Sequence, residues 1–306
     1  MKIGYIKKWL NMISHKGVLH AKKGIGPQWE KNRIKGFYID YSAKLQNKNI
    51  DSDGLPYNIL ADQRRVKIPI TIIQYGLGAC EKWFETEQEN EKLIVEKVAS
   101  YLSEHQQEDG GWDSFVEIDP NDRRSSMVQA EAAAFFIRAS IITNDDQYMR
   151  LAKKAIDQML LPVENGGASV YSGDDLFFYE FVGKPLVLNG WIYSIFGLYD
   201  YYLATNDKSI YGVIDKTKKT LIASLKRFDC KYWSYYNLDK AIASPFYHEL
   251  HIVQLDILYI LFGDEDFKNY RNKWTSYNNS KIKHFLAVSV KVIQKLKSLK
   301  KNDMIE

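Results

Sequence analysis

Apolar side chains recur with a helical period of about 3.6 residues along most of the chain after residue 70. The segments with this period come in pairs, and a short polar turn joins the two members of each pair. The first member is apolar on nearly all sides, whereas the second carries one apolar stripe. We therefore predict hairpins of a buried inner helix and a partly solvated outer helix at 72–84 and 92–105, 125–142 and 148–160, 187–203 and 210–225, and 248–262 and 266–277.

The hairpins form an internal repeat. Thr143-Asn144-Asp145 and Thr205-Asn206-Asp207 lie 62 positions apart, and each separates an apolar segment from an amphipathic one. Glycine pairs or a tryptophan close the outer helices, at 109–112, 165–167 and 230–233, before short extended stretches. The sequence therefore predicts a mainly α fold, an incomplete (α/α) barrel or toroid of about four helical hairpins, with its functional end where the loops after the outer helices gather.

The two ends of the chain lack this repeat. Residues 35–41 and 66–70 read as short strands around the polar loop 47–53, and Met1–Ile13 has one apolar face. We therefore predict three parts: 1–70 as a basic helix with a small β-containing extension, 71–280 as the (α/α) barrel and 281–306 as a basic helix or tail.

Composition narrows the class of protein. Hydrophobic residues make up 45% and charged residues 26% of the 306 residues, which is typical of a globular chain. The 21 tyrosines supply flat faces and hydroxyl tips that suit sugars, although packing explains most of them. Cys80 and Cys230 stand far apart and outside any metal-ligand spacing, so we expect neither a disulfide framework nor a metal site.

Charge gathers at the two ends of the chain. Residues 1–35 hold nine Lys and Arg against Glu30 alone, and residues 281–301 hold seven Lys and no acid. Such ends suit an anionic membrane surface or an acidic polymer, while a short N-terminal helix packed on the body is the alternative that the pattern favours. No nucleic-acid-binding motif accompanies the charge. Without an apolar run long enough for a bilayer, we expect a soluble cytoplasmic protein, at the inner face of the membrane if the basic ends bind it.

Three stretches resemble the C-terminal catalytic domain of the D-glucuronyl C5-epimerases. They are Ile73–Leu77, the run Val187–Asp200 and Tyr247–Leu255, of which the second is the most specific. The resemblance covers roughly residues 37–280. It implies a helical (α/α) barrel that follows a smaller β-containing part, a bacterial member acting on a heparosan-like capsule glycan, and a homodimer.

The resemblance also implies the residues that move protons. Epimerisation at C5 removes a proton beside a carboxylate and returns one to the opposite face of the ring, so two groups on opposite sides are needed. Glu180, in an aromatic stretch, matches the family's acid/base glutamate, and Tyr247 matches its catalytic tyrosine. Tyr236 matches a further functional tyrosine. From the residues alone, a salt-bridged carboxylate and packing phenols are the commoner interpretation.

Further residues are candidates for holding the sugar. The basic residue expected to bind the uronate carboxylate differs from the family pattern, because Asp239 stands where a basic residue is usual. In a second departure, Phe181 replaces a usual tyrosine. An arginine at 123, 124 or 65 could supply a bidentate contact to the uronate. The predicted substrate-binding residues are Tyr75, Arg123, Arg124, Asn189, His248 and His251.

The resulting hypothesis is a cofactor-independent polysaccharide uronate C5-epimerase that converts D-glucuronate to L-iduronate residues. Its partner would be an acidic glucuronate-containing polysaccharide. A polysaccharide lyase is the alternative enzyme, because β-elimination begins with the same C5 proton abstraction. A non-catalytic glycan-binding protein is the third reading, which the changes at Phe181 and Asp239 leave open. No GxGxxG follows a predicted strand, so nothing calls for NAD.

Overall fold

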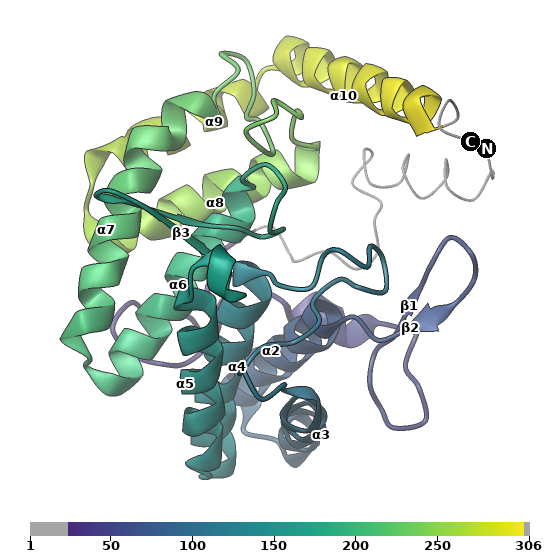
Figure 1. Ribbon diagram of the computed structural model, residues 1–306, viewed down its shortest axis with the longest axis vertical. Helices are drawn as coiled ribbons and strands as arrows, with labels where there is room; N and C mark the ends of the chain where they lie inside the picture. Colours follow the sequence, from purple (N-terminus) through teal and green to yellow (C-terminus); the bar gives the residue numbers. More distant parts are fainter. Residues whose placement is uncertain (1–23, 303–306) are drawn as a thin grey trace. The chain divides into compact units, whose positions relative to one another are not determined.

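A computed structural model describes residues 24–302, in which the helices predominate (Figure 1). The predicted N-terminal helix at Met1–Ile13 lies outside the described residues. The helices are α2 (Pro69–Thr86), α3 (Glu89–His105), α4 (Ser126–Thr143), α5 (Gln147–Leu160), α6 (Leu188–Thr205), α7 (Lys208–Ser224), α8 (Pro245–Phe262), α9 (Glu265–Asn278) and α10 (Lys281–Asn302). The strands form two small hairpins, β1 (Asn58–Ile59) with β2 (Arg65–Val66) and β3 (Ser169–Ser172) with β4 (Asp175–Phe178).

The chain divides by its contacts into two compact units. Of the described residues, what we call the N-unit comprises 24–186 and 190–221, and the C-unit comprises 187–189 and 222–302. The predicted boundaries at 70 and 280 stay a prediction, since these units follow other limits. Each unit holds one cysteine: Cys80 is fully buried in the N-unit, and Cys230 is half-buried in the C-unit.

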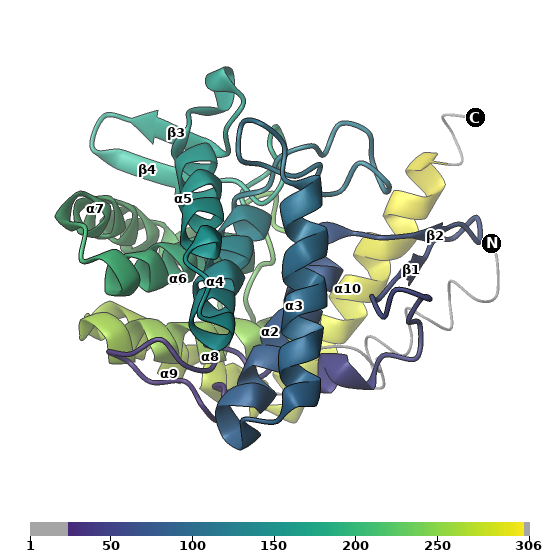
Figure 2. The same cartoon turned by 90° about the horizontal axis from the view of Figure 1, so that it is seen from below.

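The four predicted helical hairpins are present as α2–α3, α4–α5, α6–α7 and α8–α9, so the mainly α fold class built on helical hairpins is confirmed. Within the N-unit, α4 lies between α2 and its outer partner α5 (Figure 2). The inner helix α4 is buried on all sides, whereas α5 buries mainly one stripe. Alanines at 130, 132, 133 and 134 keep α4 thin enough for neighbours to pack all around it.

One backbone conformation closes every inner helix. The residue after each of α2, α4, α6 and α8 has a positive φ, at Glu87 (51°), Asn144 (55°), Asn206 (55°) and Gly263 (76°). Asn and Gly tolerate this left-handed conformation, and the cap N–H groups then reach the last helical carbonyls, as Asn144 reaches Ser140. The two Thr-Asn-Asp motifs are therefore interhelix turns, as predicted.

The predicted strand at 35–41 is reduced to a single antiparallel bridge between Ile39 and Ile25, because side chains of inner helices satisfy part of the backbone of this segment. The Phe37 N–H donates to Glu81 Oε2 of α2 at 3.0 Å, while Arg138 of α4 donates to the Lys35 and Gly36 carbonyls at 2.8 and 3.0 Å. Arg138 also pairs with Asp200 of α6 at 2.6 Å. The predicted strand at 66–70 is only partly right, since Val66 ends β2 and Pro69 begins α2.

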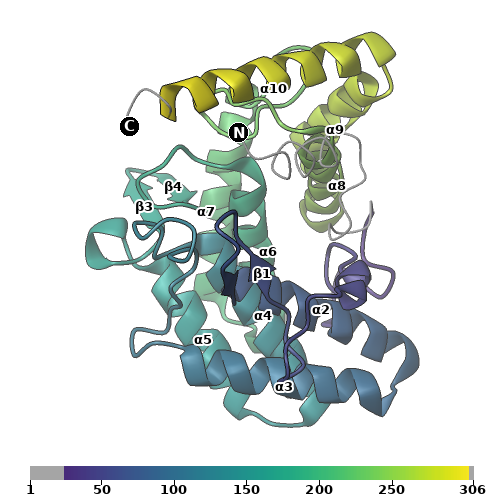
Figure 3. The ribbon, with the colours of Figure 1, turned by 90° about the vertical axis from the view of Figure 1, so that its right-hand side faces the viewer.

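In the C-unit, α9 folds back against α8, whereas α10 turns away from α9 and makes few contacts with it (Figure 3). The predicted basic C-terminal helix is thus present as α10. No helix in the described part of the chain is long and apolar enough to cross a bilayer.

Candidate active site

Glu180 of the N-unit lies two residues after β4, in the segment that leads to α6. The preceding residue, Tyr179, donates its N–H to the Ala168 carbonyl at 2.9 Å and accepts from the Ser126 N–H at the start of α4, also at 2.9 Å. The following residue, Phe181, packs its ring on Phe115 at a centroid distance of 5.0 Å. The Glu180 side chain is only 4% exposed. The residues on both sides of Glu180 are therefore held in place.

Gly190, in the first turn of α6, makes room for this carboxylate. A Cβ built on Gly190 would lie 2.6 Å from the Cβ of Glu180, and nearer still to its carboxylate oxygen Oε2. Any side chain at position 190 would therefore push the carboxylate away. This glycine serves close packing, because the helix needs no unusual backbone conformation there.

In the C-unit, the structure brings Tyr236 and Tyr247 together. Their ring centroids lie 4.9 Å apart at an interplanar angle of 59°. The Tyr236 backbone is anchored by its N–H to the Ala241 carbonyl at 2.7 Å and by its carbonyl to the Leu188 N–H at 3.1 Å. Tyr247 stands in the first turn of α8, after the N-cap Ser244. The positive end of the helix dipole there favours negative charge on a nearby oxygen.

His248 and His251 lie fully buried one helical turn inside α8. Ser234 Oγ is 2.8 Å from His248 Nδ1 and 2.9 Å from His251 Nδ1, and His248 Nε2 is 3.1 Å from the Trp274 carbonyl. Because that carbonyl only accepts, His248 carries its proton on Nε2. Burial lowers the pKa of His248 to about 3 and that of His251 well below its usual range. Both imidazoles are therefore neutral at physiological pH.

These contacts make the two histidines an internal support for α8. His248 also stacks on Trp233 at a centroid distance of 3.7 Å, which ties the 228–244 loop to the helix that carries Tyr247. His251 Nε2 is buried without a hydrogen-bond partner among the described residues. The predicted contact of both histidines with substrate stays a prediction.

The two candidate arginines bind acids of their own loop in the N-unit. Arg123 pairs with Asp113 at 2.8 Å, and Arg124 pairs with Asp109 at 2.5 Å while donating to Gln107 at 2.7 Å. A uronate carboxylate would have to displace partners of Arg124 to gain a bidentate contact with it, whereas Arg123 contacts Asp113 through one nitrogen and stays exposed. Arg65, the other candidate, lies over the Tyr57 ring at 5.1 Å.

The remaining candidates are buried. Tyr75, in the N-unit, lies on α2 with 7% exposure, and burial raises the pKa of its phenol. Asn189, in the C-unit, accepts a hydrogen bond from Gln254 through its carbonyl at 3.2 Å. Their roles in sugar binding stay predictions. Among the residues that the structure describes, no group of three or more His, Cys, Asp or Glu side chains could hold a metal ion.

Sequence reasoning missed three residues that support these groups: Gly190, Ser234 and Trp274. A glycine inside an apolar helix was the available signal for a close approach at Gly190. Nothing in the sequence singles out Ser234 or Trp274, because only the fold brings them to the imidazoles.

Two solved structures show distant likeness to this chain. An unsaturated glucuronyl hydrolase from Bacillus sp. GL1 has a TM-score of 0.48 at 14% identity, covering 68% of this chain and 61% of that chain. A glycoside hydrolase family 76 mannosidase from Bacteroides thetaiotaomicron has a TM-score of 0.47 at 13% identity, covering 68% and 57%.

Two relatives are similar in sequence. An uncharacterized protein of Methanocaldococcus jannaschii is 26% identical over 257 residues, which are 79% of each chain. A D-glucuronyl C5-epimerase of Caenorhabditis elegans is 26% identical over 209 residues, which are 59% of this chain and 34% of the nematode protein. The chain thus spans about a third of the length of that epimerase.

The family model for the D-glucuronyl C5-epimerase C-terminus matches residues 106–276. This range is more than half of the chain and contains Glu180, Tyr236 and Tyr247. The chain therefore belongs to the D-glucuronyl C5-epimerase family through this C-terminal domain.

Proposed function

We propose that this protein epimerises uronate residues of a polysaccharide at C5, converting D-glucuronate to L-iduronate. The match of residues 106–276 to the family's C-terminal model carries the proposal. The substrate is an acidic glucuronate-containing polymer, and the overall reaction moves protons without changing oxidation state. It requires no redox cofactor.

In the proposed mechanism, Glu180 and Tyr247 are the two proton-transfer groups, the roles that the family resemblance implies for them. One group takes the C5 proton, and the other returns a proton from the other side. The buried carboxylate at Glu180 suits this role, because burial strengthens its electrostatic interaction with charge that develops nearby. Tyr236, paired with Tyr247, would orient that phenol or relay its proton.

The test is hydrogen exchange at C5. Wild-type protein incubated with a glucuronate polymer in deuterated water should place deuterium at C5, detected by NMR. Glu180→Gln and Tyr247→Phe should each lower this exchange by ~100-fold or more, because each removes one proton-transfer group. The exposed-site controls Glu164→Gln and Tyr211→Phe should keep full exchange.

The products separate this proposal from its alternatives. A lyase would shorten the polymer and form an unsaturated uronate that absorbs ultraviolet light. These products would show that the enzyme catalyses elimination and not epimerisation. A glycan-binding protein would show affinity for the polymer without exchange in any variant. Full exchange in Glu180→Gln or Tyr247→Phe would contradict the role given to that residue.

Gly190→Ala tests the position of the carboxylate without touching its chemistry. The added methyl group should displace Glu180 and lower C5 exchange by ~10-fold or more, because a misplacement of about 1 Å costs rates of this order. Gly212→Ala, where a Cβ meets nothing within 4 Å on α7, is the matched control and should leave exchange unchanged. Unchanged exchange in Gly190→Ala would mean that the position of Glu180 is not decisive.

A further inference from the structure

The helix α10 turns polar side chains toward the rest of the C-unit. Lys291 Nζ donates to the Ile242 carbonyl at 2.7 Å, and the Gln294 side chain accepts from the Ile242 N–H at 2.9 Å and donates to the Lys240 carbonyl at 3.0 Å. These three bonds hold α10 on the 228–244 loop. The inner face of the helix is therefore held by these hydrogen bonds together with the buried Ala287 and the contact of His284 with Trp233.

The outer face of α10 is apolar. At about 100° per residue, five exposed side chains fall within an arc of about 100°, opposite Lys291. Ile282 and Phe285 are 81% and 72% exposed. This apolar stripe comprises Ile282, Phe285, Leu286, Ile293 and Leu296. The arrangement is the reverse of a surface helix in a globular protein, so the apolar stripe requires a partner that is itself apolar.

The charge around the apolar stripe is of one sign. Residues 267–302 contain ten Lys and Arg and no Asp or Glu. Lys281, Lys283 and Lys297 border the apolar stripe in the helical projection. Lys283 also lies over the Tyr277 ring at 4.2 Å. Apolar residues bordered by lysines are typical of a helix that lies in the plane of an anionic membrane surface.

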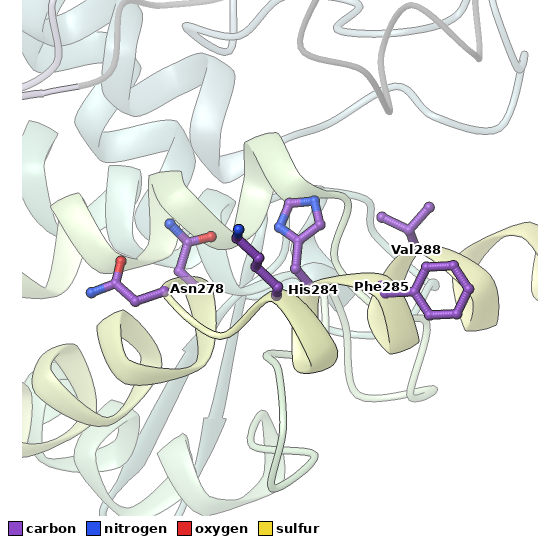
Figure 4. A pocket seen from close by; sticks show the side chains of 6 residues that line it. Asn278, His284, Phe285 and Val288 are labelled. Atoms are coloured by element: carbon purple, nitrogen blue, oxygen red, sulfur yellow. The ribbon is translucent and has the colours of Figure 1, made fainter.

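A shallow, open depression adjoins the apolar stripe where α9 meets α10. Its volume is about 410 Å³, and Figure 4 shows Asn278, His284, Phe285 and Val288 along it. Asn279 and Lys281 complete the lining. Amide and ammonium donors beside an apolar wall suit a lipid phosphate with the start of its acyl chains.

We propose that α10 docks this protein on an anionic lipid bilayer, with the apolar stripe inserted among the lipids and the bordering lysines on their headgroup phosphates. The helix lies along the surface and does not cross the membrane. This inference is independent of the proposed function.

Charge decides against two other occupants of the apolar stripe. A second copy packed by the same helix would set lysines against lysines, with no acid on α10 to pair them. Residues 1–18 of this chain carry four lysines and no acid, so they offer the lysines of α10 no complementary charge. A bilayer that contains anionic lipid supplies both the apolar phase and the negative charge.

The experiment measures flotation of the full-length chain with vesicles of phosphatidylcholine, with or without about 30% phosphatidylglycerol. Wild-type protein should bind the anionic vesicles at least about tenfold more tightly than the neutral ones, since each basic residue adds about fivefold at such a surface. Raising the salt concentration should weaken this binding.

Two variants separate the apolar and charged contributions. Phe285→Ser with Ile293→Ser should weaken binding by at least about tenfold, and Lys281→Glu with Lys297→Glu should weaken it by a similar factor. The matched controls change exposed residues elsewhere: Ile118→Ser with Ile141→Ser, and Lys154→Glu with Lys226→Glu. Because all eight positions lie on the surface, circular dichroism should show a native fold throughout.

Three outcomes would overturn the proposal. Wild-type protein that binds neither kind of vesicle would remove the bilayer as partner. Full binding by the Phe285→Ser, Ile293→Ser variant would assign membrane contact to another part of the chain. In the third outcome, the wild-type protein is a dimer, this variant is a monomer, and neither binds vesicles. The apolar stripe would then be a contact between two copies of the chain.

Discussion

The two units bury polar side chains by different means. The N-unit keeps a charged pair inside, Arg138 with Asp200, and surrounds it with hydrogen-bonding partners that include Tyr38 and the Gly36 carbonyl. The C-unit buries His248 and His251, whose protons are lost because burial lowers their pKa. A guanidinium cannot give up its proton, so it must be paired, whereas an imidazole can be neutralised. The two interiors should therefore respond differently to mutation and to pH.

The largest expected effect is the loss of one partner from the N-unit pair. Arg138→Met leaves the Asp200 carboxylate buried without its cation and frees the carbonyls of 35–36, so we expect a loss of ~3–5 kcal/mol in the free energy of unfolding. Urea titration followed by circular dichroism measures it. The double variant Arg138→Met with Asp200→Leu should recover part of the loss, because no unpaired charge remains. A loss below ~1 kcal/mol in the single variant would show that the pair is not structural.

A smaller effect should follow acidification of the C-unit. The folded-state pKa of His248, about 3, lies below the unfolded value of about 6.5, so the unfolded state binds the extra proton between these limits. Stability from neutral His248 is present above pH 6.5 and falls toward pH 3 at about 1.4 kcal/mol per pH unit. The free energies of unfolding of wild-type protein and His248→Gln are compared at pH 6 and pH 4. The variant should gain stability relative to wild-type protein by about 1.4 kcal/mol for each pH unit of acidification.

The N-unit should show a still smaller effect of opposite sign at Glu131. Burial raises the pKa of this carboxyl to about 8, beside the Tyr41 hydroxyl at 3.0 Å. The neutral Glu131 carboxyl stabilises the folded state fully below pH 4.5, and this stabilisation is lost as the pH rises toward 8. Glu131→Gln keeps a polar side chain that does not titrate, so it should gain ~2 kcal/mol over wild-type protein between about pH 5 and pH 6.5. Parallel pH profiles for the two proteins would contradict the assignment of a neutral Glu131.

The sequence predicted regular elements well and side-chain partners poorly. The four hairpins followed from apolar periodicity, and the two Thr-Asn-Asp turns followed from their repeated place between an apolar and an amphipathic segment. The segment at 35–41 has strand-like residues, but its hydrogen-bonding groups pair with Glu81 and Arg138, which are distant in sequence. No local pattern contains such a pairing.

The same division holds for the candidate site. The family resemblance marked Glu180, Tyr236 and Tyr247, while the pairing of the two phenols and the space that Gly190 leaves for Glu180 became visible only in three dimensions. The arginines at 123 and 124 show the reverse case. Their sequence positions suggested a substrate contact, and the fold gives both of them acidic partners in their own loop.

The placement of one thiol in each unit gives the protein its own reporters of opening. Burial raises the pKa of the Cys80 thiol to about 12, so iodoacetamide can react with it only when the N-unit opens. Cys230 is partly accessible in the C-unit and should be alkylated without such opening. Alkylation rates of the two cysteines, separated by mass spectrometry, would therefore show whether the units unfold together or one at a time.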